Sequence, residues 1–183
     1  MSNFITKLDY TSDNEKVMTE LHTLLATSAK WEPDNQIGLR HRVGSSDQWT
    51  DSTGSLIDRI SKIESNVEAD FSIWNDDCPQ YTREILEHLA HIEGVTWGRV
   101  RFMRSMKKTG LSMHYDKEPR YHLILRTNPN AIFGECFKNN PIRSTCYHLP
   151  ADTHWYKVDT TREHFVYNGG WDERIHLVAC PAA

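Results

Sequence analysis

The chain has 183 residues, with 21 Lys and Arg against 25 Asp and Glu, so its formal net charge at neutral pH is −4 when the ten histidines are counted as neutral. A chain of this length buries enough surface to fold without a disulfide or a structural metal, so a metal site here would serve chemistry. The mean hydropathy is −0.63, and no apolar run approaches the roughly 20 residues of a membrane span. We therefore expect no membrane partner, and without a basic block we expect no bulk nucleic acid partner, while a nucleic acid substrate stays open.

The N-terminal residues lack the basic start and apolar stretch of a secretory signal, so we expect a cytoplasmic protein. The four cysteines are dispersed along the chain without a CxxC pair. This spacing predicts free thiols rather than a zinc site or a disulfide framework.

Three segments have the apolar spacing of amphipathic helices. They cover residues 11–28, a stretch from Ser55 through Ile63, and residues 79–94. Pro79 suits a first helical turn and Gly94 suits a helix end. Because each segment has one apolar face, each should pack against another part of the protein.

The second half of the chain changes to short runs of branched and aromatic residues separated by turn residues, which predicts strands. Many short strands without intervening helices indicate an antiparallel sandwich, and a double-stranded beta-helix (jelly roll) is the leading candidate. The expected fold is mainly β with flanking helices, in one domain over 1–183, with a helical and mixed part at about 1–95 and the core at about 96–180. The predicted strands lie near 37–43, 71–74, 99–105, 111–115, 120–126, 144–148, 153–158, 164–167 and 174–179.

The run GLSMHYD places His114 and Asp116 two residues apart on a predicted strand, so both side chains should point to the same face. An imidazole and a carboxylate are two members of the two-histidine, one-carboxylate triad that binds Fe(II) and leaves the opposite face open. A surface pair on an ordinary strand is the alternative. The third member should be His164, because His148, His154 and His176 lack a comparable context.

His164 begins a predicted strand, and the turn residues 168–170 separate it from a second strand that begins at Arg174. A hairpin of this length would bring Arg174 back beside His164 with its guanidinium in the same interior. A buried arginine needs an anion, and a dicarboxylate would supply a charge-assisted, two-pronged contact. A surface ion pair with Asp172 or Glu173 remains the alternative.

The stretches GRVRFMRSMKKTGLSMHYDKEPRYHLILRTN and REHFVYNGGWDERIHLVAC resemble the aspartyl/asparaginyl beta-hydroxylase branch of the Fe(II) and 2-oxoglutarate dependent dioxygenases. The resemblance covers about residues 95–180. It implies a cupin-like jelly-roll core, Fe(II) bound by His114, Asp116 and His164, and Arg174 on the C5 carboxylate of 2-oxoglutarate.

The same branch has an Arg-x-His pair on the next strand that contacts the co-substrate, and the run RYHLIL offers Arg120 and His122. The period of two places both on one face. An ordinary buried His122 with an exposed Arg120 is the alternative. The hydroxyl that assists co-substrate binding in some relatives has only Ser105 as a candidate.

The activity that the resemblance implies is hydroxylation of a C–H bond of an amino-acid side chain, either peptide-borne Asp, Asn or Pro or a free amino acid. The reaction would consume 2-oxoglutarate and O₂ and release succinate and CO₂, with ascorbate as a candidate reductant. The alternative function is a jelly-roll protein that is not an oxygenase, either a metal-dependent isomerase or lyase or a small-ligand binding module. Candidate substrate contacts are Trp49, Thr50 and Asp51 and a predicted loop from Asn128 to Arg143.

Overall fold

The computed structural model describes residues 3–31, 35–56, 66–137 and 140–182. The chain divides into two compact units, one from Met1–Asn14 and Arg104–Leu177, the other from Glu15–Met103 and Val178–Ala183. Within the described ranges, every helix is too short or too polar to cross a membrane.

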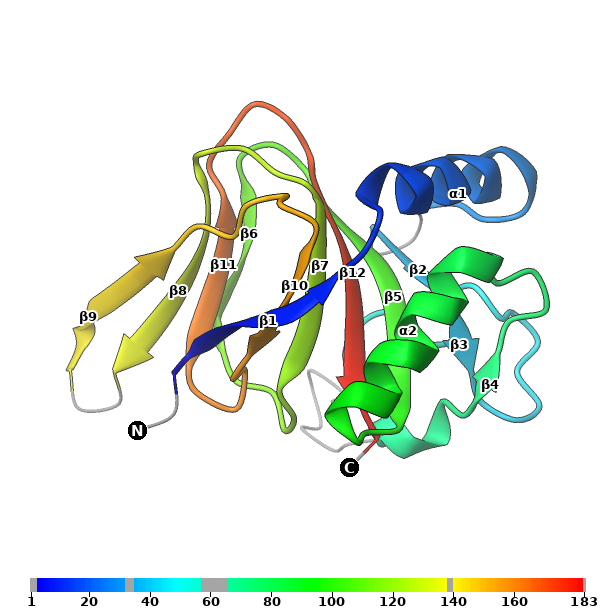
Figure 1. The fold of residues 1–183 in the computed structure, drawn as a ribbon. Coiled ribbons are helices and arrows are strands. Elements are labelled where there is room, and N and C mark those ends of the chain that lie inside the picture. The colour runs from blue at the N-terminus through cyan, green and yellow to red at the C-terminus, as the bar shows by residue number, and fades with distance from the viewer. Residues whose placement is uncertain (1–2, 32–34, 57–65, 138–139, 183) are drawn as a thin grey trace. The chain divides into compact units, whose positions relative to one another are not determined.

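The first unit contains two antiparallel sheets that face each other (Figure 1). In one sheet, β10 pairs with both β1 and β7, and β12 follows β7. Only the start of β12, up to Leu177, belongs to this unit. The bounds are β1 Ile5–Thr11, β7 Arg120–Arg126, β10 His154–Val158 and β12 Arg174–Pro181.

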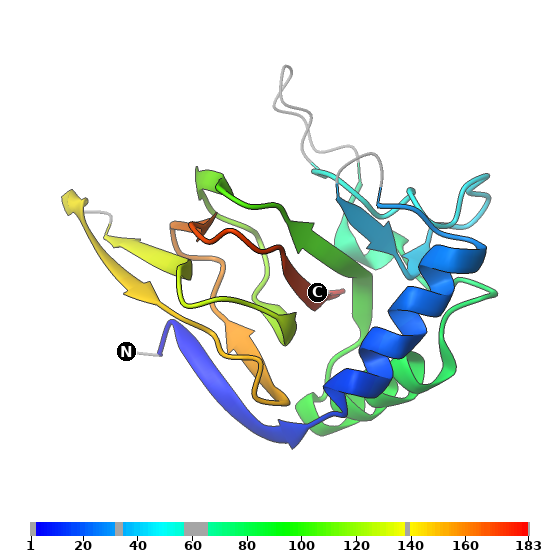
Figure 2. The same cartoon turned by 90° about the horizontal axis from the view of Figure 1, so that it is seen from above.

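The opposite sheet has the strand order β6-β11-β8-β9, and all of its neighbours are antiparallel. Its edge strands are therefore β6 and β9. In Figure 2, β9 (yellow) lies at the outer edge of this sheet and β1 (blue) at the outer edge of the other. The bounds are β6 Thr109–His114, β8 Ala131–Phe137, β9 Asn140–Tyr147 and β11 His164–Asn168.

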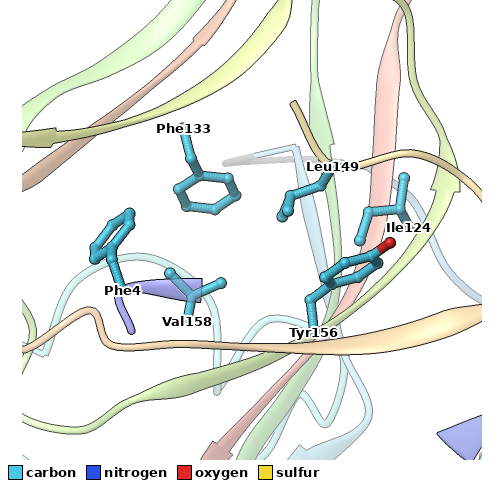
Figure 3. Packing of buried hydrophobic residues seen from close by; sticks show 6 residues of the cluster. All are labelled: Phe4, Ile124, Phe133, Leu149, Tyr156 and Val158. Carbon is cyan, nitrogen blue, oxygen red and sulfur yellow. The ribbon is translucent and has the colours of Figure 1, made fainter. Parts of the chain in front are cut away.

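A cluster of buried apolar side chains fills the space between the two sheets (Figure 3). It draws residues from β7, β8 and β10 and from the segment before β1, so it joins both sheets into one core. This arrangement confirms the predicted mainly β fold with a jelly-roll core. The members are Phe4, Ile124, Phe133, Leu149, Tyr156 and Val158.

The second unit contains both α-helices, most of β5 and the short strands β2, β3 and β4. In this unit β2 pairs with β5, and β3 with β4. The bounds are α1 Asn14–Thr27, β2 Gln36–Gly38, β3 Arg40–His41, the 3-10 helix Glu68–Asp70, β4 Ile73–Trp74, α2 Gln80–Glu93 and β5 Trp97–Ser105.

Local chemistry explains where α2 begins and ends. The Glu20 carboxylate accepts hydrogen bonds from the backbone N–H groups of Tyr81 and Thr82, both at 2.9 Å, and so satisfies donors of the first turn. The helix ends at Gly94, whose φ of 65° is the left-handed conformation that favours glycine.

Two of the three predicted helices are present as α1 and α2, whereas the one predicted from Ser55 through Ile63 falls largely outside the described residues. The sequence did not predict β1 and β8. The predicted loop from Asn128 to Arg143 is wrong, because it holds β8 and the start of β9. Gly134 and Glu135 interrupt the apolar pattern of β8, which hid the strand.

Candidate metal centre and co-substrate site

Two neighbouring strands of the first unit bring three candidate metal ligands together. His114 ends β6, Asp116 follows two residues later, and His164 begins β11. The pairing of these strands places His164 directly opposite His114. One ligand atom from each of the three residues lies within 4.8 Å of the other two. The structure thus brings together the set that the sequence predicted.

Backbone carbonyls orient both imidazoles. Nδ1 of His114 lies 2.7 Å from the carbonyl oxygen of Ser112, and Nδ1 of His164 lies 2.9 Å from that of Arg162. A carbonyl oxygen only accepts, so Nδ1 carries the proton in each ring and Nε2 keeps the lone pair. Nε2 of His164 faces Oδ2 of Asp116 at 3.8 Å. Both rings therefore have the tautomer that a metal ligand requires.

Among the described residues, only one of the two carboxylate oxygens of Asp116 has a hydrogen-bond partner. Its backbone N–H donates to the carbonyl oxygen of Thr160 at 2.8 Å, and its Oδ1 forms an ion pair with Arg120. Oδ2 is buried and has no hydrogen-bond donor among the described residues. The two imidazoles and the carboxylate each present a lone pair to the same space, and no proton lies between them. A bound cation would relieve the repulsion between these lone pairs. Two neutral nitrogens and one carboxylate suit a divalent first-row metal ion, so the residues fit Fe(II).

Burial keeps His164 in the form that binds metal. Loss of solvent lowers its pKa, and the charge of nearby His114 lowers it further, while the bond to the Arg162 carbonyl opposes them. Because only a neutral imidazole coordinates a metal, this shift favours binding at neutral pH.

Arg174 is a buried cation that has no anionic partner in the described part of the chain. It begins β12 with 7% of its surface exposed, and no carboxylate of the described residues forms an ion pair with it. Burial lowers its pKa to about 9, which still leaves it protonated at neutral pH. Its Cζ lies 4.9 Å from the centre of the Phe133 ring, and the His164 ring lies 6.4 Å from the same ring. The guanidinium of Arg174 and the metal cluster therefore both adjoin the side chain of Phe133.

The two residues of the Arg-x-His pair have different surroundings. Arg120 forms an ion pair with Asp116 and so lies at the metal cluster. His122 is buried, and its ring packs edge-on against Phe133 and His176 at centroid distances of 5.3 and 5.5 Å. The structure therefore places Arg120 beside the metal ligands and His122 in the core that also holds Arg174.

Sequence reasoning missed His176. Its Nδ1 lies 3.4 Å from Nη2 of Arg174 and 3.3 Å from Nδ1 of His122. Its Nε2 is buried and has no partner in the described part of the chain. A buried cation that has no carboxylate partner among the described residues, beside a buried ring nitrogen without a hydrogen bond, fits an anionic ligand. The spacing of two residues from Arg174 could have revealed His176, because alternate residues of a strand share a face.

Sequence reasoning also missed Glu135, since it did not predict β8. Glu135 lies directly opposite His164 in the β8–β11 pair. Its buried carboxylate forms an ion pair with Arg162 and accepts a hydrogen bond from the Tyr147 hydroxyl at 2.9 Å. A second charged cluster therefore adjoins the metal ligands on the same sheet.

The predicted hairpin between His164 and Arg174 is wrong. Strand β11 pairs with β6 and β8, whereas β12 belongs to the opposite sheet next to β7. The turn at residues 168–170 carries the chain from one sheet to the other. The two residues still meet at Phe133, but they approach it from different sheets.

The other candidate contacts do not join this cluster by any described interaction. Trp49, Thr50 and Asp51 belong to the second unit, where Asp51 forms an ion pair with Arg42. The hydroxyl of Ser105 lies 3.3 Å from that of Thr109.

Comparison with solved structures finds similar folds in proteins of less than 20% sequence identity. The chain resembles an oxidoreductase of the 2OG-Fe(II) oxygenase family from Burkholderia pseudomallei, with a TM-score of 0.59 and 16% identity over 98% of this chain and 84% of the other. It resembles a prolyl-4-hydroxylase from Pseudomonas putida, with a TM-score of 0.55 and 9% identity over 99% and 93%. A prolyl hydroxylase from Trichoplax adhaerens, in complex with a peptide fragment of hypoxia inducible factor, gives 0.55 and 9% over 99% and 84%.

The family model of the aspartyl/asparaginyl beta-hydroxylases matches residues 11–180. The chain belongs to this family and is an oxygenase of the 2-oxoglutarate dependent hydroxylase class. No curated protein sequence matches the chain. Iron and 2-oxoglutarate are the cofactor and co-substrate that the family and the fold imply.

Proposed function

We propose that this protein hydroxylates a C–H bond of an amino-acid side chain, with Fe(II) bound by His114, Asp116 and His164. The reaction would consume O₂ and convert 2-oxoglutarate to succinate and CO₂, with ascorbate as a reductant that maintains Fe(II). Residues 1–183 would act as one catalytic domain. Bound Fe(II), together with 2-oxoglutarate and O₂, supplies the oxidising power that no amino-acid side chain has.

One observation carries this proposal: three candidate metal ligands and a buried cation, which has no anionic partner among the described residues, adjoin the same aromatic ring. One ligand atom from each of His114, Asp116 and His164 lies within 4.8 Å of the other two, and Oδ2 of Asp116 lies 3.8 Å from Nε2 of His164. Arg174 and His164 both contact Phe133, with the Arg174 Cζ 4.9 Å and the His164 ring centroid 6.4 Å from the centre of its ring. A ligand that bridges the two centres needs a metal-binding end and an anionic end, and 2-oxoglutarate has both.

In this proposal the chain's own residues bind and orient. Arg120 holds Oδ1 of Asp116, which leaves Oδ2 to the metal. Arg174 binds the distal carboxylate of the co-substrate. His122 and Arg120 complete the co-substrate site from β7, with Arg120 on the metal side.

The substrate class follows from the family name and from the neighbours. The family name refers to aspartyl and asparaginyl side chains, and two of the three solved structures reported above are prolyl hydroxylases, one of them in complex with a peptide fragment. We therefore propose Asp, Asn or Pro, either in a peptide or as the free amino acid, as the first substrates to test.

The test is an assay for succinate and for a mass gain of one oxygen atom in the substrate. The purified protein is incubated with Fe(II), ascorbate, 2-oxoglutarate and each of a panel of free amino acids and peptides. Succinate that depends on both iron and Asp116 supports the proposal. Failure of the Mn(II) protein to bind 2-oxoglutarate without oxygen would overturn it and favour a jelly-roll protein that is not an oxygenase.

A further inference from the structure

His176 is a buried titratable residue that the proposed function does not use. It is 4% exposed, and it lies two residues after Arg174 on β12. Its ring contacts two groups of the proposed co-substrate site, the guanidinium of Arg174 and the imidazole of His122.

The contact with Arg174 determines which ring nitrogen carries the proton. A guanidinium only donates hydrogen bonds, so Nη2 of Arg174 donates and Nδ1 of His176 accepts. The proton of His176 is then on Nε2, and Nδ1 of His122 donates to the same acceptor. Burial and the charge of Arg174 both lower the pKa of His176 well below its usual value, so the ring is neutral.

A neutral partner of Arg174 differs from a carboxylate because it does not cancel the positive charge of the guanidinium. A carboxylate would orient the guanidinium and also cancel its charge. The described surroundings of Arg174 orient it with uncharged groups, the face of Phe133 at 4.9 Å and Nδ1 of His176 at 3.4 Å. The positive charge therefore stays available to an anion that enters the core.

We propose that His176 is a positioning residue that holds the Arg174 guanidinium toward the distal carboxylate of the co-substrate without neutralising it. It thereby sets the preference of the site for 2-oxo acids that have a second carboxylate. This inference rests on the proposed function, because it assumes that Arg174 binds 2-oxoglutarate.

The experiment measures binding rather than turnover. The Mn(II) protein is titrated by calorimetry, without oxygen, with 2-oxoglutarate and with its carboxamide analogue, in which the distal carboxylate is replaced by a neutral amide. We compare the wild type with His176→Leu, which has no acceptor, His176→Asn, whose amide oxygen can replace Nδ1, and His176→Glu, which adds a charge. His154→Leu is the matched control, since its Nδ1 bonds only to Asp152 among the described residues.

We expect His176→Leu to bind 2-oxoglutarate roughly tenfold to a hundredfold more weakly, the range for a lost hydrogen bond to a charged group, and to bind the amide analogue almost as the wild type does. His176→Asn should stay within about threefold of the wild type, and His176→Glu should lose at least about a hundredfold for 2-oxoglutarate. The control should bind both ligands normally. Mn(II) affinity and circular dichroism verify that each variant is folded.

Wild-type affinity in His176→Leu, or equal losses for both ligands, would overturn the inference and leave the proposed function intact. If His176→Leu does not fold, the comparison of Asn with Glu decides, and equal affinities for 2-oxoglutarate would overturn the inference. If the wild type itself does not bind 2-oxoglutarate, the proposed function fails and this inference fails with it.

Discussion

His164 and Arg174 face the same aromatic ring from two different sheets. The His164 ring centroid lies 6.4 Å from that of Phe133, and Cζ of Arg174 lies 4.9 Å from it. The two residues are ten positions apart in the chain, and the crossing between the sheets places them on separate walls of one core. The metal cluster and the cation therefore adjoin the same aromatic side chain.

Replacing Arg174 with Leu should have opposite effects on binding and on stability. Loss of the charge-assisted contact should weaken 2-oxoglutarate binding by about 2 to 5 kcal/mol, while Mn(II) binds as before. In the ligand-free protein the same change removes a buried charge that has no anionic partner among the described residues, so the free energy of unfolding should rise. Calorimetric titration and urea denaturation measure the two effects. Arg126→Leu, at an exposed ion pair with Glu173, is the control. Unchanged 2-oxoglutarate affinity would assign the anion to another basic residue.

Replacing Asp116 with Asn keeps the shape of the side chain and removes the charge that faces the two imidazoles. We expect the affinity for Mn(II) or Fe(II) to fall at least about a hundredfold and succinate formation to stop. Competition with a chromogenic chelator measures metal affinity. Asp172→Asn, at an exposed carboxylate, should bind metal normally. Normal metal affinity in Asp116→Asn would refute its assignment as a ligand.

The ion pair between Arg162 and Glu135 should contribute to stability. Arg162→Ala leaves the buried Glu135 carboxylate with the Tyr147 hydroxyl, at 2.9 Å, as its remaining side-chain partner among the described residues. We expect a loss of about 1 to 3 kcal/mol in the free energy of unfolding, a reduced value because the Arg162 side chain is 37% exposed. Adding Glu135→Gln to Arg162→Ala should recover part of this loss in urea denaturation. A double variant less stable than Arg162→Ala would contradict this account.

The metal-free protein should lose stability as the pH falls below about 6.5. The pKa of His176 is well below its usual value, because burial and Arg174 disfavour its charged form. The unfolded chain therefore takes up a proton that the folded protein excludes. This contribution to stability is fully present above the unfolded pKa and is lost below it, by about 1.4 kcal/mol per pH unit. Urea denaturation between pH 7.5 and 5 measures the slope, which should be shallower in His176→Asn. Equal slopes would show that His176 is protonated in the folded protein.

The sequence predicted those elements whose apolar pattern is regular. The stripe of Val17, Leu21 and Leu24 gave α1, and the apolar run of β12 gave a buried strand. It did not predict β8, since Gly134 and Glu135 break the pattern. Glycine is needed there because a Cβ on Gly134 would lie 2.0 Å from the Phe165 ring.

The sequence could predict those parts of the candidate site whose residues lie close together on a single strand. The spacing of His114 and Asp116 predicted a shared face, and the structure brings both to His164. Spacing alone cannot distinguish a hairpin from a crossing between sheets, so the pairing of β11 with β12 was predicted wrongly. The rule that found Asp116 also applies to Arg174 and His176, but an arginine two residues away is not a recognised signal for a functional histidine.

The position of β6 has a consequence for how metal and fold depend on each other. It is the edge strand that carries His114, and its side chains Leu111 and Met113 are about half exposed. Among the described strands only β11 pairs with it, so its amide protons should exchange with solvent sooner than those of the inner strands. A metal ion bound by both His114 and His164 would cross-link β6 to β11. Metal loading should then slow deuterium uptake along β6 and leave β7 unaffected.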